Sequence, residues 1–192
     1  LRAQAWSASP TIVEIGLGDR GGPTFFDLVD RIRTDQEPML QQARFIGLEA
    51  DPVRAGRARA QIMAGTLVEV QTGGFDAPAR LNPAGVEVIV VRNVLQHYPS
   101  SEERPTIFQA LGQGLKEGGL LVVGTNHVMG VYQKRDNRFE PIELLLQLSD
   151  EPVRQTIERG TTFATLLPLN GLHECDAERL LPVLQEAVQA EN

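Results

Sequence analysis

The sequence predicts an α/β domain of the open, doubly wound type, in which a mostly parallel sheet carries helices on both faces. Three observations support this prediction. Short, almost continuously apolar segments recur along the chain, as is typical of strands buried on both faces. Segments with the apolar spacing of amphipathic helices separate most of them. A cluster of glycines directly follows the first apolar segment, where such a fold needs a tight turn into its first helix.

The expected strands are β-branched or leucine-rich runs that end at glycines or acidic residues. They cover residues 11–15, 44–48, 67–70, 86–91 and 120–123. The first helix is capped by Thr24 and places Phe25, Leu28, Val29 and Ile32 on one face. A second helix begins with proline at its first position, and a third begins at paired serines followed by glutamates. These two helices are expected from Pro52 to about Met63 and from Ser100 to Gly118–Gly119.

The connections and the last third of the chain have weaker patterns. Pro38 is expected in a loop, and residues 75–85 are expected to form a proline-broken connection. Farther along, residues 141–148 and 176–189 have helical patterns, whereas 161–167 could be a strand. We therefore expect one domain over residues 1–192, with a core at 11–124 and a completing segment at 125–192 that finishes the sheet and helps to cover the ligand site.

Composition excludes several classes of function. The chain has 192 residues with 18 Lys and Arg against 25 Asp and Glu, a net charge of -7 that does not suit a nonspecific grip on nucleic acid. Arg54, Arg57 and Arg59 are interpreted as one solvated helix face. No apolar run is long enough to cross a bilayer. Cys175 is the single cysteine, so we expect neither a disulfide nor a Cys/His metal site, in a cytoplasmic protein.

The glycine cluster is the first candidate for a ligand site. Gly16, Gly18 and Gly21 match the GxGxxG pattern of dinucleotide-binding turns, which alone is a weak signal. Asp19 lies inside this turn and would repel a pyrophosphate unless Arg20 turned inward to compensate. A cofactor with positive charge and no phosphate, such as S-adenosylmethionine, suits this turn better.

The end of the second expected strand offers two carboxylates, Glu49 and Asp51. Glu49 can accept hydrogen bonds from both hydroxyls of a ribose, with a charged acceptor. Asp51 directly precedes the second helix and is interpreted as its N-cap. The alternative for the pair is a solvated strand end with a cap and no ligand.

Residues 11–124 resemble the class I S-adenosylmethionine-dependent methyltransferases, which have a Rossmann-like fold. Four segments carry the resemblance, in the order and at the spacings that a core of five strands requires. They are TIVEIGLG at 11–18, FIGLEADP at 45–52, VIVVRNVLQH at 88–97 and LKEGGLLVV at 115–123. Two departures are that the third glycine comes one residue late, at Gly21, and that the helices which normally precede the first strand are missing. We therefore expect a processed product or part of a longer chain or complex.

The resemblance implies S-adenosylmethionine as cofactor and a role for each matching position. The methionine end would be held by the first strand and the glycine turn, the ribose by the second strand end, and the adenine by the second and third strand ends. Residues past the fourth strand would lie near the methyl group. In that order, the implied cofactor-binding residues are Glu14, Gly16 and Gly18; Glu49; Ala50, Gly74 and Phe75; and Arg92 and Asn93.

Methyl transfer needs a base only when the acceptor must first lose a proton. His97 and His127 follow the fourth and fifth expected strands and are the candidate catalytic bases, with loop packing as the alternative. Asn126 could orient an acceptor. Trp6, Tyr98 and Tyr132 could line an acceptor pocket, although buried packing suits aromatic residues at least as well.

The functional hypothesis is therefore methyl transfer to an unidentified acceptor, either a small molecule or a group on a carrier or protein. Two alternatives stay open. One is a methyltransferase-like domain that binds without turnover. The other is an NAD(P)-dependent oxidoreductase that uses the same glycine turn. The second lacks a Tyr-x-x-x-Lys pair, because Tyr132 is followed by Lys134 at the wrong spacing. No membrane or nucleic-acid partner is expected.

Overall fold

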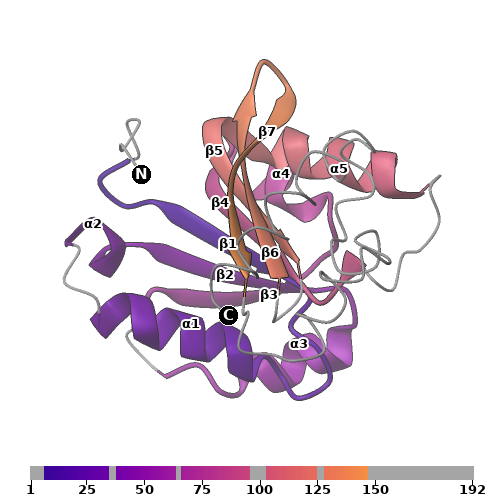
Figure 1. Ribbon diagram of the computed structural model, residues 1–192. Helices are drawn as coiled ribbons and strands as arrows, with labels where there is room; N and C mark the ends of the chain where they lie inside the picture. The colour runs from indigo at the N-terminus through magenta and orange to yellow at the C-terminus, as the bar shows by residue number, and fades with distance from the viewer. Residues whose placement is uncertain (1–6, 35–37, 64–65, 96–102, 125–127, 147–192) are drawn as a thin grey trace, which may run out of the picture.

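A computed structural model describes residues 7–34, 38–63, 66–95, 103–124 and 128–146. In this part of the chain the strands form one seven-stranded sheet in the order β3-β2-β1-β4-β5-β6-β7 (Figure 1). The first five strands run parallel to one another. They are β1 (Thr11–Ile15), β2 (Arg44–Glu49), β3 (Val68–Thr72), β4 (Val86–Arg92) and β5 (Leu115–Gly124). The predicted core of five parallel strands is therefore confirmed.

Helices cover both faces of the sheet, as predicted. On one face lie α1 (Pro23–Thr34), α2 (Pro38–Gln41) and α3 (Pro52–Arg59) (Figure 1). Phe25 and Val29 of α1 and Ala55 and Ala58 of α3 pack there against alternate strand residues in one buried cluster. On the other face lie α4 (Ala77–Leu81) and α5 (Glu103–Gly114), which form a second buried cluster with the opposite side of the same strands. Because each central strand is buried on both faces, its sequence is almost continuously apolar.

The sheet ends in an antiparallel hairpin that the sequence analysis did not predict. β6 (Val128–Arg135) pairs antiparallel with β5, and β7 (Arg138–Leu146) pairs antiparallel with β6. Between them, Asp136 and Asn137 both have positive φ, at 50° and 60°. Two such residues are what a two-residue hairpin turn requires, and Asp and Asn tolerate this conformation best after glycine.

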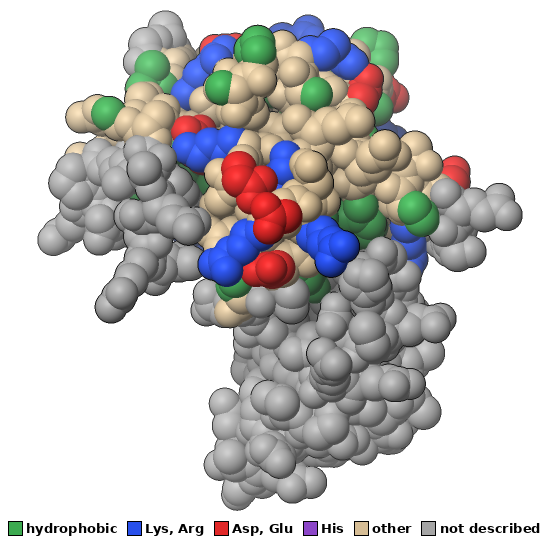
Figure 2. Space-filling model, turned by 90° about the horizontal axis from the view of Figure 1, so that it is seen from above, with side chains coloured by type: hydrophobic (Ala, Val, Ile, Leu, Met, Phe, Trp, Pro, Cys, Tyr) green, Lys and Arg blue, Asp and Glu red, His purple; other side chains and the backbone are tan. Residues whose placement is uncertain are grey.

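This hairpin corrects the prediction of a helix over residues 141–148, because residues up to Leu146 belong to β7. β7 is the edge strand of the described sheet, the place where a strand tolerates a proline such as Pro141. Charged residues cover the tip: Arg135 pairs with Glu140 at 3.2 Å, and Glu117 accepts the N–H of Asp136 at 2.8 Å. Figure 2, seen from above, shows acidic and basic side chains next to one another on this face.

Several boundaries differ from those expected. Pro38 begins the short helix α2, where a loop was predicted. The connection over residues 75–85 contains α4, whose proline lies in the first turn, where a helix tolerates it. α3 ends at Arg59, earlier than Met63, and α5 ends at Gly114, where β5 begins at once. The strand and helix predicted over 161–167 and 176–189 lie outside the described residues. No helix in the described part is long and apolar enough to cross a membrane.

Candidate functional site

The candidate site lies where the strand order reverses, at the carboxyl ends of β1 and β4. From β1 the sheet grows through β2 and β3 in one direction, and from β4 through β5 in the other. The loops that leave β1 and β4 therefore diverge to opposite faces, and a crevice opens between them. The glycine turn leaves β1 at this point, and Asn93 leaves β4 with a φ of 56°. Both loops thus have unusual backbone geometry at the edge where ligands bind in such sheets.

A cavity of about 450 Å³ occupies this position, a size suited to a small-molecule ligand. Its lining comes from the loops that follow β1, β2, β3 and β4 and from the start of α3. Seven of the nine predicted cofactor-binding residues are part of the lining: Gly16, Gly18, Glu49, Ala50, Gly74, Phe75 and Asn93. The structure thus brings together residues that are 77 positions apart in the sequence, counting from Gly16 to Asn93.

Glu49 is the last residue of β2 and is 5% exposed. Its Oε2 accepts the N–H of Gly18 and its Oε1 accepts the N–H of Asp51, each at 3.1 Å. One carboxylate therefore links the glycine turn to the loop that begins α3. A carboxylate has about four acceptor positions, so each oxygen of Glu49 can accept a further hydrogen bond from a ligand in the cavity.

The glycine turn uses its own backbone donors internally. The N–H of Gly16 donates to the carbonyl of Leu48 at 2.8 Å, that of Gly18 donates to Glu49, and that of Gly21 donates to the carbonyl of Gly18 at 3.3 Å. In a phosphate-binding turn these groups would point at the ligand. Here the three glycine amides of the GxGxxG match are already hydrogen-bonded within the protein.

Most of the charged side chains on the cavity wall are acidic. Asp19, Glu49 and Asp51 line the cavity together with a single described cation, Arg54. Asp51 caps α3 as predicted, because its side chain accepts the N–H groups of Val53 and Arg54 at 2.7 and 3.2 Å. These backbone hydrogen bonds, from Arg54 and then Val53, hold the pKa of the exposed Asp51 carboxyl below its ordinary value. The wall is therefore rich in acceptors and negative charge.

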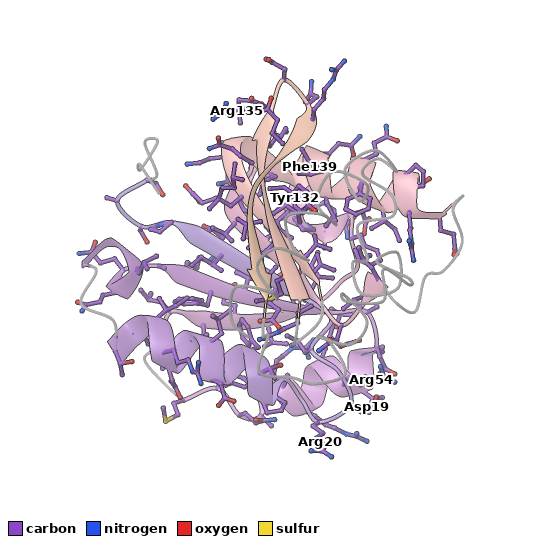
Figure 3. The ribbon with its side chains drawn as sticks, in the orientation of Figure 1. Asp19, Arg20, Arg54, Tyr132, Arg135 and Phe139 are labelled. Atoms are coloured by element: carbon purple, nitrogen blue, oxygen red, sulfur yellow. The ribbon has the colours of Figure 1, made fainter. Side chains whose placement is uncertain are left out.

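Arg54, rather than Arg20, compensates the charge of Asp19. The guanidinium of Arg54 pairs with the Asp19 carboxylate at 2.6 Å, and it lies 3.9 Å from Asp51. Figure 3 shows Asp19 and Arg54 together, whereas the exposed side chain of Arg20 extends away from them. The repulsion of phosphate by Asp19, which the sequence suggested, is thus partly cancelled. The turn is instead unsuited to a pyrophosphate because the amides of Gly16, Gly18 and Gly21 are already hydrogen-bonded within the protein.

Glu14 and Arg92 are the two predicted cofactor residues that do not line the cavity. Glu14 is the last residue but one of β1 and Arg92 is the last residue of the neighbouring strand β4; the two pair, with Arg92 Nη2 2.8 Å from Glu14 Oε1. Glu14 is 2% exposed, and its Oε2 has no hydrogen-bond partner among the described residues. Burial raises the pKa of Glu14, and the charge and hydrogen bond of Arg92 offset that rise only in part. Glu14 precedes Gly16, the first glycine of the turn, by two residues.

The sequence analysis missed some cavity residues and placed others where the structure does not describe them. Val94 lines the cavity and packs on the turn, because a Cβ built on Gly16 would lie 2.3 Å from its Cγ2. Ile15 and Gly73 were missed too, although both directly adjoin predicted residues.

His97 and His127, like Trp6, Tyr98 and Asn126, lie outside the described residues. Tyr132 is described and is 4% exposed in the core. Within the described ranges, no cluster of three or more His, Cys, Asp or Glu residues could hold a metal ion.

No protein-family model matches the chain, and no curated protein matches it. Solved structures do. The trans-methyltransferase CalH, in complex with SAH, is 21% identical, with a TM-score of 0.48 over 60% of this chain and 32% of its own. The N-methyltransferase NodS from Bradyrhizobium japonicum WM9 is 19% identical, with a TM-score of 0.44 over 62% of this chain and 58% of its own.

A putative sarcosine dimethylglycine methyltransferase from Galdieria sulphuraria is 18% identical, with a TM-score of 0.44 over 79% of this chain and 46% of its own. The chain spans less than two thirds of the length of each of these three proteins. A shared fold does not imply a shared ligand or activity. In the mostly parallel α/β sheet of its described part, as in its sequence segments, the chain is similar to S-adenosylmethionine-dependent methyltransferases.

Proposed function

We propose that the cavity binds S-adenosylmethionine and that the chain is a methyltransferase acting on a small molecule or on a group held by a carrier or protein. One observation carries this proposal: the cavity wall offers acceptors and negative charge, while the amides of Gly16, Gly18 and Gly21 already donate within the protein. The described lining contains three acidic residues and one cation: Asp19, Glu49 and Asp51, and Arg54. A ligand that donates hydrogen bonds and carries positive charge is complementary to such a wall.

The parts of the cofactor have matching surroundings. A ribose has two neighbouring hydroxyl donors, and Glu49 has acceptor capacity left on both oxygens. An adenine is flat and largely apolar, and Ala50 and Phe75 offer apolar surface on the same cavity. Glu14 and Arg92 would serve the methionine end, because Glu14 lies two residues before Gly16 and its Oε2 has no hydrogen-bond partner among the described residues.

S-adenosylmethionine supplies an electrophilic methyl group bonded to a sulfonium. The sulfur leaves as a neutral thioether, so no acid is needed to protonate it. The protein's task is then to hold the acceptor in line with that bond, and correct positioning alone can supply much of the rate. The loops after β1 and β4 frame the crevice in which this must occur. His97 and His127 remain the proposed bases for an acceptor that must lose a proton.

A nicotinamide dinucleotide fits this site less well. Its pyrophosphate needs backbone N–H groups, and the amides of Gly16, Gly18 and Gly21 already donate within the protein. Binding without turnover is a separate outcome, which the cavity's composition neither favours nor disfavours.

Calorimetric titration of the whole chain with S-adenosylhomocysteine, and with NADH at the same concentrations, tests the proposal. We expect saturable binding of S-adenosylhomocysteine and none of NADH. Binding of NADH alone would overturn the cofactor assignment, as would binding of neither. If S-adenosylhomocysteine binds, an acceptor screen with methyl-labelled S-adenosylmethionine separates a methyltransferase from a domain that only binds.

A further inference from the structure

The glycine turn is attached to α3 by side chains that reach across from the helix. Besides the ion pair between Arg54 and Asp19 at 2.6 Å, Gln61, just past the end of α3, donates from Nε2 to the carbonyl of Gly21 at 3.0 Å. Arg57 approaches the carbonyl of Asp19 at 3.5 Å. These contacts join residues 35 or more positions apart in the sequence, so they fix the place of the turn relative to the helix.

The turn needs such support because its backbone is intrinsically permissive. Gly16, Gly18, Gly21 and Gly22 all have φ between 76° and 84°. Glycine loses more conformational freedom on ordering than any other residue. The hydrogen bond that closes the turn on itself, from Gly21 to Gly18, is long at 3.3 Å.

α3, in contrast, is held firmly against the sheet. Asp51 caps its first turn, and Ala55 and Ala58 are 0% exposed against the sheet. Arg54, on the same helix, lines the cavity together with Asp19. The ion pair therefore lies on the cavity wall itself, where movement of the turn would change the shape of the site.

We propose that Arg54 is a positioning residue for cofactor binding: through Asp19 it holds the glycine turn against α3 in the conformation that binds ligand. This inference rests on the proposed function. Without the ion pair, the ligand would have to order the turn itself, and its affinity would fall. The pair is partly exposed, with side-chain exposures of 42% for Arg54 and 78% for Asp19. The expected effect is therefore modest, about two- to five-fold in the dissociation constant, and smaller at high salt.

A double-mutant cycle separates positioning from a direct effect of charge on the ligand. Arg54→Gln, Asp19→Asn and the double variant are titrated with S-adenosylhomocysteine and with S-adenosylmethionine, which carries one more positive charge. Positioning predicts that both single variants weaken both ligands and that the double variant is no worse than either. A direct charge effect predicts opposite signs for the two single variants with S-adenosylmethionine, and that result would overturn the inference.

Arg59→Gln is the matched control. Arg59 is on the same helix but donates to the carbonyl of Val70 and to the hydroxyl of Thr72 on β3, away from the turn. It should leave both affinities unchanged. An equal loss in Arg59→Gln and Arg54→Gln would show a general effect of lost charge on α3 and would overturn the inference.

Hydrogen exchange without ligand keeps this test independent of the proposed function. The amides of Gly18 and Gly21, which are hydrogen-bonded inside the turn, should exchange faster in Arg54→Gln and Asp19→Asn than in the wild type or in Arg59→Gln. If the wild type binds no S-adenosylhomocysteine, the proposed function fails while exchange still reports on the ion pair. Unchanged exchange in all variants would show that Arg54 does not hold the turn.

Discussion

Glu87 lies near the start of β4, at the amino edge of the sheet, and Glu14 lies near the end of β1, at the carboxyl edge. Both are buried, at 5% and 2% exposure, and each pairs with one cation, Lys116 at 2.9 Å and Arg92 at 2.8 Å. Their surroundings nevertheless shift the two pKa values in opposite directions. The difference lies in how many donors each carboxylate receives.

Both carboxylate oxygens of Glu87 accept hydrogen bonds. Its Oε1 accepts from the Ser7 hydroxyl and from Lys116, and its Oε2 accepts the N–H of Thr11. Burial is the largest single influence on its pKa and raises it, but the hydrogen bonds from Thr11, Lys116 and Ser7 together lower it below the ordinary value. Within the described part of the chain, Glu14 receives a hydrogen bond from Arg92 alone, so burial prevails and its pKa is raised. At the amino edge both oxygens of the buried carboxylate are hydrogen-bonded, whereas at the carboxyl edge Oε2 of Glu14 has no hydrogen-bond partner among the described residues.

The largest expected effect comes from two glycines, one near each edge, that share a backbone conformation. Gly85 has φ +82° and Gly18 has φ +76°. A Cβ on Gly85 would lie 2.5 Å from the backbone nitrogen of Lys116, whereas one on Gly18 would have nothing within 4 Å. Gly85→Ala should therefore lower the free energy of unfolding by about 2–5 kcal/mol and Gly18→Ala by about 1–2 kcal/mol. Urea unfolding of both variants measures the difference. Equal losses of unfolding free energy in the two variants would contradict the contrast between close packing at Gly85 and open space at Gly18.

The two glutamates should have opposite effects on the pH dependence of stability. Stability rises with pH wherever the unfolded chain binds more protons than the folded one. Glu87 has a lowered pKa, so its contribution is complete above its ordinary value of 4.5 and is lost as the pH falls below it. Glu14 has a raised pKa, so the folded protein loses stability as the pH rises from 4.5 through that raised value.

Replacing Glu87 or Glu14 by glutamine should remove that residue's contribution to the pH dependence of stability. At pH 7, Glu87→Gln should cost about 1.5–3 kcal/mol, because it takes a charged acceptor from its donors. It should also flatten the fall in stability below pH 4.5. Glu14→Gln should cost less than about 1 kcal/mol at pH 7, since it also removes a poorly satisfied buried charge, and should flatten the decline above pH 4.5. Midpoints of urea unfolding from pH 3 to pH 8 measure the change in stability below and above pH 4.5. The same pH dependence in both variants would refute the comparison.

The same contrast explains what could be predicted from the sequence. The parallel core was predictable because burial on both faces makes its strands continuously apolar, and the strand ends then place Gly16, Glu49, Phe75 and Asn93 at one edge. The cap at Asp51 was predictable because its position before Pro52 fixes its role. These features depend on local pattern and on the topology that the pattern dictates.

Features that depend on tertiary partners were not predictable. Nothing in the local sequence shows that Arg54, rather than the adjacent Arg20, would reach Asp19. Likewise, the pairing of Glu14 with Arg92 depends on the register between β1 and β4. The hairpin of β6 and β7 was missed although Asp136-Asn137 is a turn signal, because the apolar residues after Pro141 also fit a helix.

The central claim is that the carboxyl edge holds S-adenosylmethionine through acceptors, with Glu49 foremost. It is tested most directly by titrating Glu49→Gln and Glu87→Gln with S-adenosylhomocysteine, after circular dichroism confirms that both are folded. We predict that Glu49→Gln loses about 1.5–3 kcal/mol of binding free energy, at least about tenfold in affinity, because it takes a charged acceptor from the ribose and from the Gly18 amide. Glu87→Gln, although less stable, should bind as the wild type does. Wild-type affinity in Glu49→Gln would contradict the claim.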